Sequence, residues 1–566
     1  MVKSKNDKAS SQKAGGIKMV SNNRKIKTVN ENTKTLRKLY NQLMSKDKQY
    51  SGKPEIIKKI LKQIDGNYSE FCFKHDGCRI LQGSIKYGTV DQRALIISKL
   101  IPLLYDIING KYSIYLSAKI FKYANMNQRN EIMKNVLVPN YKKLLKFSGG
   151  ISFMRFVFMY SHANYQEQLI NMYFDEYLKI PFQKIKDNFD HGTHKNEDED
   201  VEMKNENIIV EKAESFESED IREKIKTHLE KQLENGVSKN YIFHGFLNKV
   251  FDYLDEKTQV YISELFDDDF MPFLNNNYGF KLACKLYAVA GAKTRKKVIK
   301  LIRENINDLI TSDNGTYFII KIILFTDDTK IIEKNLLKFI VEKLTENFQG
   351  NQNIIKIVWN IFFPFNKKCN NNAQQEVLAF SKPYSNKKDL EKRQNEIIAP
   401  IFEDLYKIIA YEVRYLLSDE LFSIFLTDFI SYLLDKDEIE KIEEMLNHIT
   451  SILELDIKSN KDTISNSLFA DRVGHKTIKR IMKSLSETKK EGKKYMFGFI
   501  EKIAKLLKVN LEAFLNTKAI FIIVQIMENE KTKSLIKDDL EKFRSEIEKN
   551  KTNTKLAGMV LLGKLI

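Results

Sequence analysis

Two stretches of the chain repeat one pattern, Lys74-His-Asp-Gly-Cys-Arg-Ile-Leu-Gln-Gly-Ser-Ile-Lys-Tyr-Gly-Thr89 and Gly110-Lys-Tyr-Ser-Ile-Tyr-Leu-Ser-Ala-Lys-Ile-Phe-Lys-Tyr-Ala-Asn125, with equivalent positions 36 residues apart. The same spacing separates Asn277-Tyr-Gly-Phe-Lys-Leu-Ala-Cys-Lys-Leu-Tyr-Ala-Val-Ala-Gly291 from Asp313-Asn-Gly-Thr-Tyr-Phe-Ile-Ile-Lys-Ile-Ile-Leu-Phe-Thr-Asp327. In each copy the apolar residues recur at three and four positions, which is typical of one face of a helix. A short polar turn then leads to a second helical run, as in residues 92–103 and 294–305. One helical pair cannot bury its own apolar face, whereas stacked pairs share a continuous core. The repeat therefore predicts an all-α fold, an α-solenoid in the form of a superhelical array.

Length and composition favour the same architecture. The chain has 566 residues, more than a single hydrophobic core accommodates, so it is either several domains or one extended array. Only 8 prolines and 22 glycines interrupt the helical periodicity. We therefore expect one array of helices.

The charge of the chain indicates a polyanionic partner. The formal net charge is +18 and the sequence pI is about 9.2, which suits nucleic acid or an acidic membrane surface. Between residues 197 and 224 twelve acidic residues stand against four basic ones, a local charge of −8 that leaves +26 for the rest of the chain.

Three further features concern the cellular compartment. Four scattered cysteines are too few for a disulfide framework in a chain of this length, which suggests a reducing compartment. The first thirty residues are polar and rich in lysine, without the apolar segment of a signal peptide. No apolar run approaches the roughly 20 residues that a membrane span requires. We expect a soluble intracellular protein that does not associate with membranes.

Shifts in composition divide the chain. Residues 1–30 are predicted to be a disordered basic tail, and residues of about 188–220 a disordered acidic loop, because both lack apolar periodicity. Residues 31–366 contain the clear repeats. Residues 367–393, which include Asn370-Asn-Asn372, are predicted to be a polar linker or loop, and residues 394–566 a degenerate continuation of the repeats.

One motif resembles a known family. Residues 73–82 read Phe-Lys-His-Asp-x-x-Arg-x-x-Gln and are followed by Lys-Tyr-Gly-Thr at 86–89, which resembles Pumilio-homology (PUF) repeats. Residues 277–300, 327–330 and 385–394 are more specifically similar to the divergent Puf-A, or penguin, branch, whose C-terminal half carries a CPL region. The similarity runs from about residue 31 to the end of the sequence, excluding the acidic loop. It implies that residues 31–366 are Pumilio-homology repeats and that residues 394–566 are the CPL region.

The resemblance also implies a shape and a function. It implies an L-shaped array of about eleven repeats, located in the nucleus and mainly in the nucleolus, that binds RNA or DNA with little sequence preference. It further implies a role as an assembly factor of the large (60S) ribosomal subunit and in pre-rRNA processing. The partners would then be pre-ribosomal RNA and proteins of the pre-60S particle, with messenger RNA as a further target reported for some members.

The residues that read bases in ordinary Pumilio repeats are mostly replaced. In such repeats, one helix presents three side chains to each base, and the resemblance assigns these positions to Cys78, Arg79 and Gln82 in the first clear repeat. The matching trios elsewhere are Ile114, Tyr115, Ala118; Ile151, Ser152, Arg155; Phe280, Lys281, Cys284; and Thr316, Tyr317, Ile320. Apolar side chains cannot hydrogen-bond a base edge, so a code of one base per repeat cannot operate. Affinity is expected from phosphate contacts and from stacking on Tyr115 or Tyr317.

The candidate nucleic-acid-binding residues are therefore drawn from these positions and from lysines near the repeat ridges. They are Cys78, Arg79, Gln82, Tyr115, Arg155, Lys281, Lys285, Tyr317, Lys296, Lys297 and Lys300. The alternative is that the two tyrosines belong to the core, that Arg79 forms an ion pair, and that the lysines are only solvated.

The sequence offers no motif for catalysis, a metal or a cofactor. Cys72, His75 and Cys78 are spaced three apart, but no second pair of ligands follows them. We expect a monomer without enzymatic activity or a small-molecule substrate. Two other functions stay open: a protein-binding adaptor of the HEAT or importin type, and a messenger-RNA-binding translational repressor.

Overall fold

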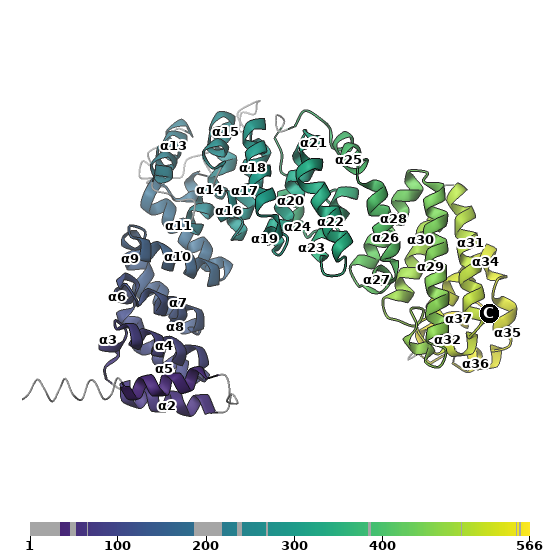
Figure 1. Ribbon diagram of the computed structural model, residues 1–566, viewed down its shortest axis with the longest axis horizontal. Helices are drawn as coiled ribbons and strands as arrows, with labels where there is room; N and C mark the ends of the chain where they lie inside the picture. The colour runs from purple at the N-terminus through teal and green to yellow at the C-terminus, as the bar shows by residue number, and fades with distance from the viewer. Residues whose placement is uncertain are drawn as a thin grey trace, which may run out of the picture. The chain divides into compact units, whose positions relative to one another are not determined.

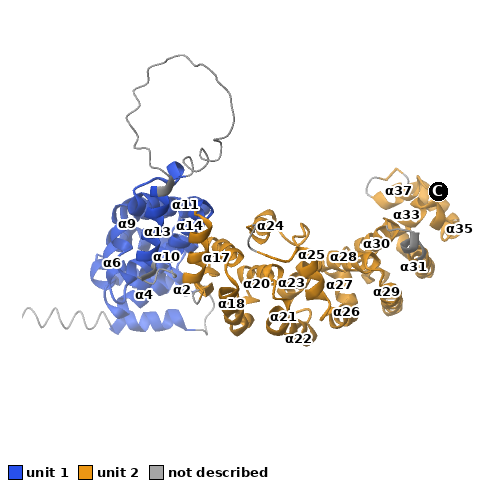
Figure 2. Ribbon diagram, turned by 90° about the horizontal axis from the view of Figure 1, so that it is seen from above, with its two compact units in different colours: residues 1–253 blue, residues 254–566 orange. Residues whose placement is uncertain are grey.

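A computed structural model of the protein describes residues 34–45, 52–64, 66–185, 218–234, 240–267, 270–382, 386–487, 490–550, 552–553 and 556–566. Among these residues the regular elements are helices and none is a strand, which confirms the all-α prediction. The helices form two compact units, residues 1–253 and 254–566 (Figure 2). The predicted basic tail lies outside the described residues, as does the predicted acidic loop up to residue 217, where helix α13 follows.

Unit 1 begins with a helix at residues 34–44 and continues as a series of helical pairs. Its helices are α2 (Lys53–Ile64), α3 (Tyr68–Phe71), α4 (His75–Tyr87), α5 (Val90–Leu100), η2 (Ile101–Leu103), α6 (Leu104–Asn109), α7 (Ile114–Tyr123), α8 (Met126–Ile132), η3 (Met133–Leu137), α9 (Val138–Leu144), α10 (Ser148–Tyr160), α11 (Ala163–Tyr173), η4 (Phe174–Leu178), α13 (Ser218–Glu234), α14 (Tyr241–Val250) and η7 (Phe251–Tyr253). Helices α4, α7, α10 and α14 pack successively against one another and form the inner row of this unit (Figure 1).

Unit 2 continues the pairing of helices over a longer stretch. Its helices are α15 (Glu256–Leu265), α16 (Phe270–Phe273), α17 (Asn277–Val289), α18 (Ala292–Glu304), α19 (Ile306–Leu309), α20 (Asp313–Phe325), α21 (Thr329–Ile332), η8 (Glu333–Leu337), α22 (Lys338–Glu346), α23 (Gln352–Phe362), α24 (Asn372–Ala379), α25 (Leu390–Ile398), α26 (Phe402–Tyr411), α27 (Val413–Ser418), α28 (Phe422–Asp435), α29 (Ile439–Ser459), η9 (Ile464–Asn466), α30 (Gly474–Glu487), α31 (Lys490–Lys508), α32 (Leu511–Leu515), α33 (Ile520–Glu528), α34 (Glu530–Lys533), α35 (Lys537–Glu541), α36 (Arg544–Asn550) and α37 (Ala557–Leu562). Here the inner row runs through α17, α20, α23, α28, α30, α33 and α37, each packed against the next (Figure 2). The solenoid predicted from the repeats is therefore confirmed within each unit, whereas the number of repeats stays a prediction.

The second helix of several pairs begins with a side-chain cap that the sequence encodes. Thr89 caps α5 by accepting a hydrogen bond from the backbone N–H of Gln92, whose side chain in turn accepts from the Thr89 N–H. Asn125 and Gln128 form the same reciprocal pair at the start of α8. These capping boxes satisfy backbone donors that a helix start leaves without partners, so they fix where each second helix begins.

An arginine in the first turn of the second helix of a pair holds neighbouring inner helices together. Arg129 donates to the carbonyl oxygens of Lys122 at the end of α7 and of Tyr160 at the end of α10. Arg295 is buried and bonds in the same way to Ala288 of α17 and Phe325 of α20, at 2.9 and 2.8 Å. Because the last carbonyls of a helix have no partner within it, a planar guanidinium that reaches two helix ends satisfies both and holds the helices in register.

A glycine marks the close approach at the start of an inner helix. A Cβ atom at Gly77 of α4 would lie 2.1 Å from the carbonyl oxygen of Phe71, and one at Gly474 of α30 would lie 2.1 Å from that of Leu468. Both contacts are too short for any side chain. The shared geometry identifies α30 as an equivalent of α4, although the sequence around it reads as a degenerate repeat.

The described residues of the predicted polar linker or loop, 367–382 and 386–393, instead include a packed helix, α24. Helix α24 packs against α17 and α20. Asn360 of α23 and Asn370 are both buried and exchange hydrogen bonds through their side-chain amides. The buried ammonium of Lys321 donates to the carbonyl oxygens of Val377, Leu378 and Phe380. The polar composition that suggested a loop reflects these buried hydrogen bonds, because polar groups inside a protein need partners.

Candidate nucleic-acid interface

In unit 1 the inner row presents some of the predicted residues to solvent and buries others. Arg79 is exposed on α4, with its guanidinium carbon 5.7 Å from the centroid of the Tyr40 ring. Tyr115 on α7 is 70% exposed, and its ring is available for stacking. Gln82 and Arg155 are partly exposed on α4 and α10, and the guanidinium carbon of Arg155 lies 5.9 Å from the Tyr241 ring centroid.

Cys78 cannot contact a base in this structure. Its side chain is 1% exposed, and its thiol donates a hydrogen bond of 2.7 Å to the carbonyl oxygen of Cys72. Burial raises the pKa of the Cys78 thiol to about 11, so it is neutral at pH 7. The residue therefore belongs to the core between α3 and α4, and of the first predicted trio only Arg79 and Gln82 reach the surface.

In unit 2 the predicted residues of α17 and α20 lie beneath or beside the segment that carries α24. Tyr317 is 3% exposed, and its hydroxyl donates to the carbonyl oxygen of Cys369 at 3.2 Å. The ammonium of Lys285 lies 5.6 Å from the Phe380 ring centroid, whereas Lys281 is partly exposed. The prediction that Tyr317 stacks on a base is therefore wrong, because residues 369–380 of the chain cover it.

The three lysines predicted near the repeat ridges lie on an outer helix. Lys296, Lys297 and Lys300 are exposed on α18, which packs against the η8 segment and is not part of the inner row. Lys297 forms an ion pair of 2.7 Å with Asp267, and the ammonium of Lys296 is 3.9 Å from the Asp328 carboxylate. The structure thus separates these lysines from the inner helices.

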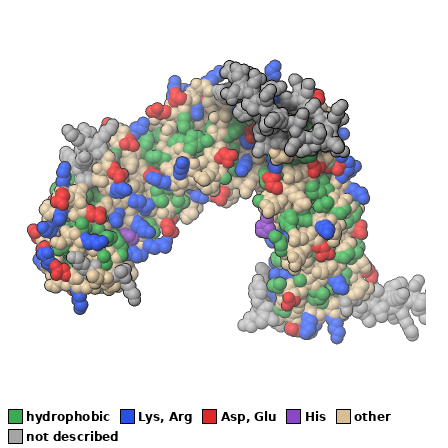
Figure 3. Space-filling model, turned by 180° about the vertical axis from the view of Figure 1, so that it is seen from behind, with side chains coloured by type: hydrophobic (Ala, Val, Ile, Leu, Met, Phe, Trp, Pro, Cys, Tyr) green, Lys and Arg blue, Asp and Glu red, His purple; other side chains and the backbone are tan. Residues whose placement is uncertain are grey.

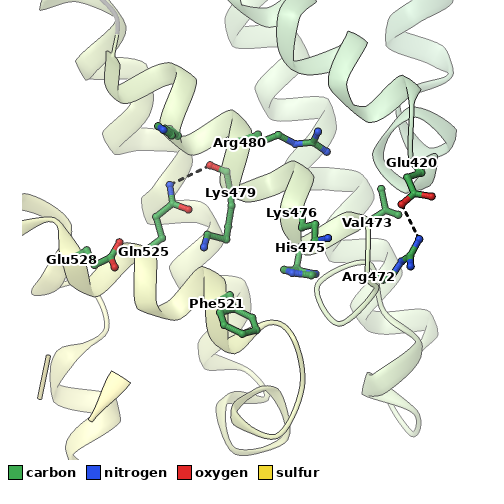
Figure 4. A pocket seen from close by; sticks show the side chains of 11 residues that line it. Glu420, Arg472, Val473, His475, Lys476, Lys479, Arg480, Phe521, Gln525 and Glu528 are labelled. Atoms are coloured by element: carbon green, nitrogen blue, oxygen red, sulfur yellow. Dashed lines mark hydrogen bonds and ion pairs between the residues drawn. The ribbon is translucent and has the colours of Figure 1, made fainter. Parts of the chain in front are cut away.

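A concentration of basic side chains around a hollow was missed from the sequence. It is a groove of about 970 Å³ on α30 and α33, named here the α30–α33 groove, which is open on one side (Figure 4). Its size lies within the range of roughly 300–1,000 Å³ that is usual for ligand pockets. Five basic residues line it, against the two acidic residues Glu420 and Glu528: Arg472, Lys476, Lys479, Arg480 and Lys483. Figure 3 shows lysine and arginine side chains gathered on the C-terminal part of unit 2.

A pair of stacked rings lies inside the groove. The ring centroids of His475 and Phe521 are 5.9 Å apart, and their planes meet at 30° (Figure 4). The ammonium of Lys479 is 5.7 Å from the Phe521 centroid. The pKa of His475 is lowered below its usual 6.5, first by burial and then by the positive charges of Lys518, Lys476 and Lys479. His475 is therefore neutral at pH 7, and the positive charge of the groove comes from its lysines and arginines.

Polar groups connect the walls of the groove. The amide nitrogen of Gln525 on α33 donates to the carbonyl oxygen of Lys479 on α30 at 3.1 Å. Arg480 donates to the hydroxyl oxygens of Ser423 on α28 and Thr477 at 2.8 and 3.2 Å. Arg472 forms an exposed ion pair of 2.8 Å with Glu420. These bonds hold three consecutive inner helices around the groove.

The positions of the groove residues on α30 match those that were predicted to bind on α4. Relative to the equivalent glycines Gly77 and Gly474, the trio Cys78, Arg79 and Gln82 corresponds to His475, Lys476 and Lys479. The first position of each trio is buried, whereas Lys476 is exposed and Lys479 partly exposed. The spacing Gly-x-x-x-x-Lys joins Gly474 and Lys479, but it also joins Gly291 and Lys296 at the start of the outer helix α18, so this signal alone does not single out the site.

Comparison with known proteins agrees with this arrangement of helices. Residues 356–494 match the family model of the CPL (NUC119) domain. Pumilio homology domain family member 6 of Saccharomyces cerevisiae is 24% identical over 529 residues, which are 88% of this chain and 75% of the relative. The crystal structure of human Puf-A superposes with a TM-score of 0.67 at 16% identity, over 95% of this chain and 100% of that structure. Both the sequence and the fold are thus similar to those of Puf-A-like PUF proteins, and residues 356–494 match the CPL region.

The CPL match differs in extent from the predicted region. It begins at residue 356, within α23, and not at 394, and it ends at 494, within α31. It therefore includes the segment with α24 and most of the α30 side of the groove. The crystal structure of human Puf-A in complex with DNA also superposes on this chain, with a TM-score of 0.65 at 17% identity, over 94% of this chain and 99% of that structure.

Within the described ranges, no group of three or more histidine, cysteine, aspartate or glutamate residues could hold a metal ion. None of the helices in the described part of the chain is both long and apolar enough to cross a membrane.

Proposed function

We propose that this protein is an RNA-binding scaffold with little sequence preference that acts in the assembly of the large (60S) ribosomal subunit and in pre-rRNA processing. Its partners are then pre-ribosomal RNA and proteins of the pre-60S particle, and it works as a monomer in the nucleus, mainly in the nucleolus. It has no enzymatic role in this proposal.

The observation that carries the RNA-binding proposal is the α30–α33 groove. Four of its five basic residues lie on the inner helix α30, as the base-reading positions of PUF repeats lie on inner helices, and the five surround an aromatic pair. Other base-reading positions are buried, as at Cys78, Cys284 and Ile320. A surface with cations and a ring, but few groups that read base edges, favours binding to the sugar-phosphate chain.

The relatives support the choice of ligand. Several are Pumilio homologues by name, and human Puf-A has been crystallised in complex with DNA. The proposed role in the large ribosomal subunit and the proposed nucleolar location rest on the family resemblance. The net charge of +18 favours binding to a polyanion.

A salt titration of RNA binding tests the molecular part of the proposal. We expect two unrelated single-stranded RNAs of equal length to bind with similar affinity, which falls steeply between about 50 and 300 mM salt. Each phosphate contact on a single strand contributes about 0.7 to the slope of log affinity against log salt. Replacing Lys476, Lys479 and Lys483 by alanine should therefore reduce the slope by about 2.

The matched control replaces Lys296, Lys297 and Lys300 of α18 by alanine, which removes the same charge from an outer helix. We expect this variant to keep most of the affinity. An equal loss in both variants would mean that total charge and not the groove governs binding. Absence of RNA binding at about 50 mM salt, where electrostatic binding is strong, would exclude the proposal and favour a protein-binding adaptor.

Crosslinking and sequencing of the RNA bound in cells tests the biological part. We expect the reads to concentrate in the pre-rRNA of the large subunit. Reads concentrated in messenger RNAs with a shared sequence motif would contradict the proposal and support translational repression.

A further inference from the structure

We propose that the α30–α33 groove binds one unpaired nucleotide of a single-stranded RNA, with the base against the Phe521 ring and the adjoining phosphates on the lysines of α30. This inference rests on the proposed function and adds the site and the form of RNA that the site takes. It follows from the ring, the charges and two polar atoms of the groove.

Phe521 is a ring held in place on one side and partly exposed on the other. Its partner His475 is 6% exposed, and its Nδ1–H donates to the carbonyl oxygen of Asp471 at 2.7 Å, so the imidazole is fixed. Phe521 stacks on this fixed imidazole and lines the groove with its remaining surface (Figure 4). A base can stack on such a ring whatever its identity, because every base has a π face.

The cations are arranged for a strand that passes the ring. Lys476, Lys479 and Lys483 recur at three- and four-residue spacing and so lie along one face of α30, and Arg472 lies two residues before this helix begins. With a rise of about 1.5 Å per residue, Lys476 and Lys483 are about 10 Å apart along the helix axis. Phosphates on both sides of one stacked base can therefore each meet a lysine.

Two polar atoms in the wall of the groove lack partners within the described residues. They are Nε of Arg480, a donor, and Oε1 of Gln525, an acceptor, and both are buried. Both residues line the groove, so a polar ligand that enters it can supply these two atoms with hydrogen-bond partners once the side chains turn toward it. The edge of an unpaired base carries both donors and acceptors, whereas in a duplex these edges are occupied by pairing.

The test compares the full chain with Phe521→Leu, which removes the ring and keeps an apolar side chain. Fluorescence anisotropy would measure binding to a labelled ten-nucleotide oligouridylate, to the same strand annealed to oligoadenylate, and, by competition, to inorganic polyphosphate and polyglutamate. We expect the affinity of Phe521→Leu for the single strand to fall about 5- to 100-fold, the loss typical of one stacked base. Binding of the duplex and of polyphosphate should change less than about twofold, because neither offers an unpaired base.

Two further variants separate loss of the ring from loss of structure. Phe521→Tyr retains an aromatic ring and should restore the binding of the single strand. Phe497→Leu removes a ring that is 39% exposed on the outer helix α31 and should leave binding unchanged. As an independent readout, ultraviolet crosslinking of the oligouridylate to the wild-type chain should label the peptide that contains Phe521.

The outcomes distinguish this inference from the proposed function. If Phe521→Leu binds the single strand like the wild type, or loses duplex and polyphosphate equally, the nucleotide site is wrong even where the lysine variant confirms RNA binding. If neither Phe521→Leu nor the triple lysine-to-alanine variant of α30 affects binding, the groove is not the RNA site and both proposals fail. Competition by polyglutamate as strong as that by RNA would assign the groove to an acidic protein.

Discussion

Substitution of Arg295 provides a stringent test of how the inner helices are held together. Its guanidinium donates to the carbonyl oxygens of Phe325 and Ala288 at 2.8 and 2.9 Å, and its guanidinium carbon lies 5.5 Å from the Tyr287 ring centroid. The residue is 7% exposed. Arg295→Ala therefore removes two charge-assisted hydrogen bonds and leaves the last carbonyls of α17 and α20 buried beside a small cavity.

The expected loss follows from these two bonds. Leaving one buried acceptor without a partner costs about 1–3 kcal/mol, so two carbonyls together cost roughly 2–6 kcal/mol. Arg295→Lys keeps the charge, but its single ammonium lacks the planar fork that reaches both carbonyls, so about half of the loss should remain. In a repeat array each repeat contacts only its neighbours, so the damage should concentrate in α17 and α20.

Hydrogen exchange measured by mass spectrometry resolves such a local loss. Protection of the amides in the last turns of α17 and α20 should fall by roughly 30-fold or more in Arg295→Ala, since about 1.4 kcal/mol corresponds to a factor of ten. Lys296→Ala, at the adjacent exposed position of the same helix, serves as the control and should change protection less than about twofold. A fall of less than tenfold in Arg295→Ala, or an equal fall in the control, would show that the arginine does not hold these helices together.

Three further predictions concern other parts of the chain. Gly474→Ala should destabilise the protein by about 1–3 kcal/mol in thermal unfolding, because its Cβ would lie 2.1 Å from the Leu468 carbonyl oxygen. The control Gly498→Ala in α31, where a Cβ would meet nothing within 4 Å, should instead stabilise the protein slightly. Equal changes in stability for the two variants would contradict the close approach at Gly474. Burial lowers the pKa of Lys321 from 10.5 to about 7, so between these two pH values the unfolded chain binds more protons than the folded chain. The stability that this group contributes therefore rises from pH 7 to 10 by at most about 1.4 kcal/mol per pH unit, and it is constant below pH 7. The difference in stability between wild type and Lys321→Met, followed from pH 6 to 10, checks this, and a difference that falls with pH would refute it. Tyr115→Ala removes a ring that is 70% exposed; it should leave the melting temperature unchanged and weaken RNA binding several-fold if Tyr115 stacks on a base, whereas unchanged binding would assign the ring to solvent.

The fold could be predicted from the sequence because the repeats give two kinds of information. Within each copy, the apolar periodicity, the cap and the turn predict a pair of helices, and the 36-residue spacing between copies predicts that the pairs stack. Caps such as Thr89 with Gln92 depend on residues three apart, so they can be read without any tertiary contact. The degenerate C-terminal repeats also follow the pattern, and the close approach at Gly474 repeats that at Gly77.

The candidate site was predicted only in part, because position in a repeat does not determine exposure. Arg79 and Tyr115 lie on the surface as expected, whereas Cys78 and Tyr317 occupy equivalent faces and are buried. Tyr317 is covered by a segment more than 50 residues further along the chain, a contact between distant residues that local periodicity does not report. The basic groove escaped notice because α30 and α33 each read as an ordinary amphipathic helix, and their side chains form one surface only when the helices pack together.

What the sequence by itself determined is the class of fold, the helical pairing and the positive charge, since these depend on composition and on residues within one or two turns of each other. Only the tertiary structure decided which cations share a surface. It placed Lys296, Lys297 and Lys300 on an outer helix and brought Lys476 and Lys479 beside Phe521, about 40 residues later in the chain. The physical reason is that burial, and the proximity of charges to a ring, arise from packing between helices that are separated along the chain.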